Sequence, residues 1–339
     1  MYSSLLVPID GSPASARAIT VAASLARRTQ ATVHVVFVND PSAYIPFVPG
    51  EIAVPVYDAD LIREQREASA QILQREVAAL EHQGIRAVGT LLDGTVVEAL
   101  LEHGQQMATE LTIMTTHGRG GFTRLRLGSV ATSYLTRATT PVLLLHHHDH
   151  AYGTEAAPAG TDPAGTDAAG TDAAATPPAA TDLATLLPTA PLLCPVDGSG
   201  FSEAVLPHAV QFAEACGIGM ALFSVVLPHP VPMAPFGADV LLADPAFLEQ
   251  DERDRAAELT RLAATCPAGT TIHQVTDMSA GRAILDEAAR IGAGAISMAT
   301  HGRGGIARAV LGSVADEVIR HAHVPILVIH PADASDRPK

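Results

Sequence analysis

An internal duplication constrains the fold of this chain more than any other feature of its sequence. VPIDGSPAS at residues 7–15 matches CPVDGSGFS at 194–202, and THGRGGFTRLRLGSV at 116–130 matches THGRGGIARAVLGSV at 300–314. The offset between the copies is 187 at the first match and 184 at the second, so the first copy has three extra residues between them. A period this long predicts two copies of a whole domain rather than a solenoid repeat.

The length of 339 residues also suits two domains, each with its own core. We predict a first domain at 1–148, a linker at 149–188, a second domain at 189–332 and a tail at 333–339. The linker is rich in Ala, Gly, Thr, Asp and Pro, and pentads that begin Gly-Thr-Asp start at residues 160, 165 and 170. Such a composition buries too little apolar surface to offset chain entropy, so we expect the linker to be disordered.

The composition narrows the class of protein. Hydrophobic residues make up 47% and charged residues 17% of the chain, as in globular proteins, and the net charge of −15 argues against a general nucleic-acid binder. Cys194, Cys216 and Cys266 form no CxxC pair, which predicts reduced, partly buried thiols. No secretory leader and no apolar run of membrane-spanning length are recognisable, so we expect a cytoplasmic protein that contacts no membrane.

Strand and helix patterns alternate within each copy, which predicts an α/β fold. In the first copy we expect five strands with crossover helices, a doubly wound parallel sheet of the flavodoxin or Rossmann-like type with strand order 3-2-1-4-5. The expected strands are 5–9, 32–38, 85–92, 111–115 and 141–145. The last strand of each copy, 141–145 and 325–329, would be an edge that needs covering, so we predict that the two domains pair there as a pseudo-dimer.

The glycine-rich stretch leaves the fourth strand and enters a helix, where parallel sheets bind ligands. It resembles a phosphate loop without its lysine, since the only lysine of the chain is Lys339 and no Walker motif occurs. Glycines at 118 and 128, and at 302 and 312, would let phosphate approach backbone amides at a helix N-terminus. Arg119 and Arg303 could add charge, and Ser129 and Ser313 hydroxyl donors. Alternatively the glycines only form a turn and the serines only cap the helix, because Ser313 to Asp316 is a capping-box pattern.

Acidic residues end the first strand of each copy, and the predicted strand order places them opposite the glycine loop. Asp10 would face the corner at residues 114–118, and Asp197 the corner at 298–302. Either carboxylate could bind Mg²⁺ together with phosphate oxygens, or close an Asx turn, and both interpretations stay open.

The histidines at 146, 147, 148 and 150 could chelate a metal, but a strand end that enters a solvated linker explains them better. We find no nucleophile and base repeated in both copies, and the SGGxDS signature of ATP-pyrophosphatases is absent.

These motifs resemble the universal stress protein family in its tandem-domain form, over nearly all of the chain except the linker. That family is marked by G-x2-G-x9-G-[ST] after the fourth strand and by an Asp that ends the first. The resemblance implies that ATP, with Mg²⁺, binds each domain: phosphates at the glycine loop, ribose near the first-strand Asp, and adenine against main chain after strand two. In the first domain the implied residues are Pro8, Ile9, Asp10, Val38, Met114, Thr115, His117, Gly118, Arg119, Gly128, Ser129 and Val130. In the second they are Pro195, Val196, Asp197, Val225, Met298, Ala299, His301, Gly302, Arg303, Gly312, Ser313 and Val314.

The chain departs from the family motif at its first glycine, which is Thr115 in one copy and Ala299 in the other. A β-branched threonine restricts the backbone more than alanine, so the resemblance implies a weaker or shifted site in the first domain. The function it implies is a nucleotide-dependent sensor or regulator of the stress response, not an enzyme. The alternatives are an ATP hydrolase or transferase that uses the same loops, and a scaffold that binds AMP or no nucleotide. The expected partners are the nucleotide and the chain itself, through domain pairing and a possible homodimer, and no nucleic-acid polymer.

Overall fold

The structure, a computed structural model, describes residues 1–40, 59–116, 127–146, 187–228, 245–300 and 311–330. His147 to His150, the tail and nearly all of the expected linker lie outside these ranges. So do six of the implied site residues: His117, Gly118, Arg119, His301, Gly302 and Arg303. Leu187 and Pro188, which the sequence assigns to the linker, are described and buried.

Domain 1 alternates strands and helices as expected, and its strand boundaries lie within two residues of the prediction. Its elements are β1 (Ser4–Ile9), α1 (Pro13–Thr29), β2 (Thr32–Asn39), α2 (Ala59–His82), β3 (Ala87–Asp93), α3 (Val96–Gln106), β4 (Leu111–Thr115), α4 (Ser129–Leu135) and β5 (Val142–Leu145). The first helix begins as its sequence dictates, because Ser12 accepts a hydrogen bond from the Ser15 amide at 3.2 Å and Pro13 occupies the first turn.

Domain 2 repeats this order with one additional short helix. Its elements are β6 (Leu192–Pro195), α5 (Gly200–Glu203), α6 (Leu206–Cys216), β7 (Met220–Val226), α7 (Pro245–Ala263), β8 (Thr271–Thr276), α8 (Ala280–Arg290), β9 (Ala295–Ala299), α9 (Ser313–His321) and β10 (Ile326–Ile329). Helices α5 and α6 together occupy the place of α1.

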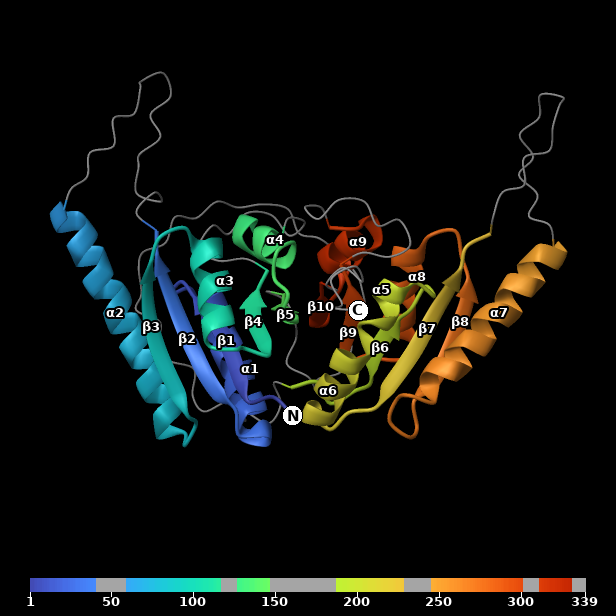
Figure 1. Cartoon of the computed structure of the whole chain (residues 1–339), viewed down its shortest axis with the longest axis horizontal. Coiled ribbons are helices and arrows are strands. Elements are labelled where there is room, and N and C mark those ends of the chain that lie inside the picture. The colour runs from blue at the N-terminus through green and yellow to red at the C-terminus, as the bar shows by residue number, and fades with distance from the viewer. Residues whose placement is uncertain (41–58, 117–126, 147–186, 229–244, 301–310, 331–339) are drawn as a thin grey trace, which may run out of the picture.

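The strands form one sheet across both domains, in the order β3-β2-β1-β4-β5-β10-β9-β6-β7-β8. Each half therefore has the predicted order 3-2-1-4-5, and all pairs within a half are parallel. The two halves meet through antiparallel pairing of β5 with β10, in which Leu143 lies opposite Leu327. The prediction that the two edge strands pair is confirmed, and helices α2 and α7 lie at opposite ends of the molecule (Figure 1).

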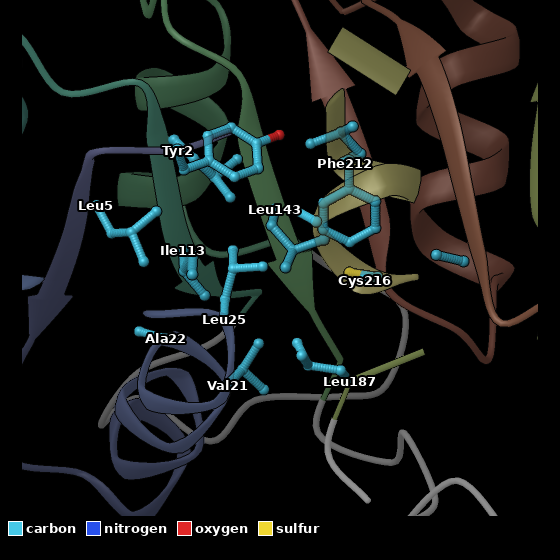
Figure 2. Packing of buried hydrophobic residues seen from close by; sticks show 14 of the residues in the cluster. Tyr2, Leu5, Val21, Ala22, Leu25, Ile113, Leu143, Leu187, Phe212 and Cys216 are labelled. Atoms are coloured by element: carbon cyan, nitrogen blue, oxygen red, sulfur yellow. The ribbon is translucent and has the colours of Figure 1, made fainter. Parts of the chain in front are cut away.

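Helices cover both faces of the sheet, and each face has one hydrophobic core that continues from domain 1 into domain 2. Residues of α1, α2, α6 and α7 line the first core, whereas residues of α3, α4, α8 and α9 line the second. Figure 2 shows the first core at the domain junction, where side chains from Tyr2, Leu143, Phe212 and Cys216 lie together. Helix α1 contacts α6 here, and the Arg28 guanidinium donates to the Cys216 carbonyl at 2.6 Å.

His146 departs from the sequence-based interpretation of a solvated strand end. It lies half-buried at the domain junction, where its Nε2 is 2.7 Å from the Ile319 carbonyl at the end of α9. Burial lowers the pKa of His146 below its ordinary value. The antiparallel pairing explains this position, because it brings the end of β5 to the start of β10.

Two buried tyrosines provide a matched test of this packing. The Tyr134 hydroxyl is 3.0 Å from the Thr112 hydroxyl, whereas the buried Tyr2 hydroxyl has no hydrogen-bond partner among the described residues. We expect Tyr134→Phe to lower the free energy of unfolding by about 1 kcal/mol, because it leaves Thr112 without its partner. Tyr2→Phe removes an unsatisfied hydroxyl, so the variant should be as stable as the wild type or more stable. Urea unfolding of the two variants measures both effects, and a larger loss for Tyr2→Phe than for Tyr134→Phe would contradict this description.

Candidate functional site

The carboxyl ends of β1 and β6 carry the same turn. Asp10 and Asp197 follow these strands, and their Oδ1 atoms accept the main-chain N–H of Ser12 at 3.0 Å and of Ser199 at 2.9 Å. The intervening glycines have positive φ angles of 79° and 75°, which favour glycine. Both aspartates thus close Asx turns, as one of the two open interpretations predicted, and each carboxylate is held at the edge of the sheet.

The glycine loops begin and end at a shared point beside these aspartates. The Gly128 amide donates to the Thr116 carbonyl at 2.8 Å, and the Gly312 amide to the Thr300 carbonyl at 2.9 Å. Because β4 pairs with β1 and β9 pairs with β6, both ends of each loop lie at the sheet edge that holds the Asx turn. This edge is the point at which the strand order reverses, where parallel sheets bind ligands.

Helices α4 and α9 begin directly after these loops, and their N-caps are Gly128 and Gly312 rather than the serines. The capping-box interpretation is therefore wrong: Ser313 is the first helical residue, and Asp316 pairs with Arg320 at 2.7 Å instead of with the helix start. Ser129 and Ser313 are exposed, and their hydroxyls make no hydrogen bond within the described part of the chain. The first N–H groups of each helix also have no hydrogen-bond partner among the described residues, and amides together with a hydroxyl suit an anion.

The other described residues of the implied sites lie on strands that end, or helices that begin, at this edge of the sheet. Val38 and Val225 are half-buried on β2 and β7, and identical registers of β1 with β2 and of β6 with β7 make them equivalent. Pro8 and Ile9, like Pro195 and Val196, end the first strand of their domain, and Val130 and Val314 pack against the second core. Met114 and Met298 are buried on β4 and β9.

The two sites differ where the motif departs from glycine. Thr115 ends β4 and Ala299 ends β9, and they pair with Leu145 and Ile329 at equivalent positions of the sheet. Thr115 is half-buried and Ala299 is buried. The β-branched side chain thus stands at the start of the loop in domain 1 only.

Sequence reasoning missed Arg255, a buried residue of α7 that reaches the turn after β6. One guanidinium nitrogen donates to the Asp197 main-chain carbonyl at 2.6 Å. The sequence carries no signal for this contact, since the two residues lie 58 positions apart and the matching helix of domain 1 has no arginine there.

Histidines that are buried or half-buried make the fold sensitive to acid. His34 and His103 lie with their ring centroids 6.3 Å apart between β2 and α3, and burial lowers the pKa of both, aided at His34 by its neighbour. Burial also lowers the pKa of His146 and His208. The fold thus favours neutral imidazoles, and the unfolded chain binds more protons once the pH falls below about 6.5.

We therefore expect the free energy of unfolding to be steady above about pH 6.5 and to fall as the pH drops from there toward the lowered pKa values. Each neutral histidine contributes a slope of at most about 1.4 kcal/mol per pH unit. Urea unfolding between pH 7.5 and 5 measures this slope, which His103→Gln should reduce. His82→Gln, at the exposed end of α2, is the control and should leave the slope unchanged. A slope unaffected by His103→Gln would contradict the assignment.

A model of the universal stress protein family matches residues 1–146 and 189–330. The chain belongs to the universal stress protein family. The match covers both halves of the ten-stranded sheet, so this universal stress protein contains two family domains in tandem.

Several relatives match this chain over nearly their whole length. A universal stress protein of Mycolicibacterium smegmatis is 24% identical over 332 residues, which cover 96% of this chain and 97% of the relative. One from Mycobacterium tuberculosis is 27% identical over 328 residues and covers 96% of each chain. The crystal structure of a universal stress protein from Archaeoglobus fulgidus superposes with a TM-score of 0.62 at 17% identity, over 97% of this chain and 98% of the other.

Within the described ranges of this universal stress protein, no helix is both long and apolar enough to cross a membrane. No group of three or more His, Cys, Asp or Glu side chains there is arranged to hold a metal ion.

Proposed function

We propose that this universal stress protein binds ATP in each domain and acts as a nucleotide-dependent regulator. The observation that carries the proposal is the exposed start of α9, beside the Asp197 turn. There the Ser313 hydroxyl and the first amides of the helix have no hydrogen-bond partner among the described residues. The same arrangement recurs at Ser129 and Asp10 in domain 1. Such a site suits a small anion. The main-chain amides and the positive end of the helix dipole can bind negative charge without a lysine side chain.

Each part of the nucleotide has residues to hold it in this proposal. Amides at the start of α4 and α9 bind the phosphates, with charge from Arg119 and Arg303 and contacts from His117, Gly118, His301 and Gly302. Pro8, Ile9 and Asp10 in domain 1, and their equivalents Pro195, Val196 and Asp197, line the ribose. Val38 and Val225 lie beside adenine.

Mg²⁺ fits the same residues. One carboxylate per domain, Asp10 or Asp197, stands beside the proposed phosphate position, and Mg²⁺ prefers one or two carboxylates with phosphate oxygens and water. The Asp197 Oδ1 atom already accepts hydrogen bonds from the Ser199 amide and hydroxyl at 2.9 and 2.6 Å, which orients the carboxylate. When bound, the ion would neutralise phosphate charge.

Regulation would follow from ligand linkage. A nucleotide that binds one conformation better than another shifts the population toward it, by no more than the difference in binding free energy. The continuous sheet, with a core on each face that spans both domains, joins the two sites, so occupancy of either site stabilises the folded chain. In this proposal the stabilised conformation is the one that a protein partner recognises.

The amount of nucleotide that copurifies with the native protein tests the proposal. After native purification and denaturation, chromatography should identify released ATP at one to two moles per chain. If only AMP were released, AMP rather than ATP would be the ligand. If the chain neither copurified with nucleotide nor bound added nucleotide, a scaffold function would be favoured. Steady ATP turnover at a metabolic rate, lost in Asp197→Asn, would instead favour a hydrolase.

A further inference from the structure

Arg255 distinguishes the two sites. It lies in the middle of α7, and its side chain is only 10% exposed, which is unusual for an arginine. A guanidinium Nη1 donates to the Asp197 carbonyl at 2.6 Å, a charge-assisted hydrogen bond that ties α7 to the end of β6.

Two carboxylates on the same helix face hold this guanidinium. The Glu258 Oε2 lies 3.2 Å from Nη1, and the Asp251 Oδ1 lies 3.8 Å from Nε. They stand one turn after and one turn before Arg255, the spacing at which helical side chains meet. The buried charge is therefore paired, and the guanidinium has a fixed position from which to bind the turn.

The turn itself is shaped to receive the guanidinium. Gly198 has a φ of +75°, and a Cβ at this position would collide with Arg255 and with Glu258. Asp197 is thus held on two sides: Ser199 binds its carboxylate, and Arg255 binds its carbonyl.

Helix α2 of domain 1 carries no arginine at the matching position. Arg66 of α2 contacts Asp93 at the end of β3, and Glu252 of α7 contacts Thr276 at the matching end of β8. The residue three positions later is Ser69 in α2 and Arg255 in α7. Ser69 is buried as well, yet it carries no charge and makes no hydrogen bond to Asp10. The chain thus uses an arginine in one copy where it uses a small neutral residue in the other.

We propose that Arg255 is a positioning residue that holds the Asp197 turn in its binding geometry, so that the domain 2 site is pre-organised for nucleotide. This inference rests on the nucleotide-binding function proposed above. A site that is already ordered loses less conformational entropy on binding, and the saving appears as affinity. The contribution of Arg255 to affinity is independent of the difference between Thr115 and Ala299. Both features favour nucleotide binding in domain 2.

The test uses the full chain with the domain 1 site disabled by Gly118→Val, so that calorimetry with Mg-ATP reports domain 2 alone. Arg255→Met keeps most of the side-chain volume but removes the donor, and we expect its Kd to rise about tenfold, as for the loss of one charge-assisted hydrogen bond. Arg255→Lys should recover part of this loss. The matched control is Ser69→Ala in a chain with Gly302→Val, in which the domain 1 Kd should not change.

The outcomes separate the inference from the function on which it rests. If Arg255→Met lowers thermal stability but leaves the domain 2 Kd unchanged, Arg255 is only structural and the inference is wrong. If Arg255→Met does not fold, Glu258→Gln is the second test variant. It removes one of the carboxylates that hold the guanidinium but keeps Arg255, and an unchanged domain 2 Kd would overturn the inference. If the chain with both sites intact binds no nucleotide, the proposed function itself fails.

Discussion

Replacing Gly302 by valine is expected to abolish nucleotide binding in domain 2. The branched side chain would keep phosphate away from the backbone amides of the loop. The loss of two hydrogen bonds to a charged phosphate, each worth about 1.5–3 kcal/mol, corresponds to at least about a 100-fold rise in Kd. Calorimetry with Mg-ATP in a chain whose domain 1 site is disabled measures this change.

A graded variant controls for simple damage to the fold. Ala299→Thr gives domain 2 the residue that domain 1 has at the start of its loop, so it should weaken binding less than Gly302→Val does. Thermal melts of the ligand-free variants measure any damage to the fold, and Ala299→Thr should lower the melting temperature because Ala299 is buried. An affinity unaffected by Gly302→Val would remove the glycine loop from the phosphate site.

Replacing Leu327 by aspartate is expected to cause a large loss of stability. Leu327 is fully buried on β10, opposite Leu143 of β5, where the two halves of the sheet join. An unpaired carboxylate in this core should cost about 4–5 kcal/mol. For domains of this size the melting temperature should then fall by about 10 °C or more.

The matched control for this variant is Leu327→Met, which conserves volume and should cost less than about 1.5 kcal/mol. Circular dichroism melts of both variants give the comparison. If the aspartate variant melted as the methionine variant does, Leu327 would not lie in the core that joins the domains.

The duplication made much of the fold predictable. Two copies of one alternating pattern predict the same strand order twice, and an apolar edge strand at the end of each copy predicts that β5 and β10 pair; the structure adds that they pair antiparallel. Both predictions rest on the pattern of apolar residues, which is a property of the sequence. The Asx turns at Asp10 and Asp197 were one of two open interpretations, because the same Asp-Gly-Ser sequence suits a turn and a metal ligand.

Other features depend on contacts that a linear pattern does not contain. The sequence Ser-Val-Ala-Asp fits a capping box with Ser313 as the N-cap, but it is equally compatible with Ser313 as the first helical residue. The extended conformation of Gly312 makes Gly312 the N-cap, so the capping box does not form. His146 contacts the other domain, so its burial follows only from the register of the central strands. The contact of Arg255 with Asp197 depends on how α7 is rotated against the sheet.

The number of ATP-binding sites per chain tests the account most directly. Equilibrium dialysis against labelled ATP with Mg²⁺ should give two sites of unequal affinity in the unaltered chain. The tighter site should be lost in Gly302→Val, the weaker one in Gly118→Val, and both in the double variant. No saturable binding in the unaltered chain, or two unchanged sites in the double variant, would contradict the account.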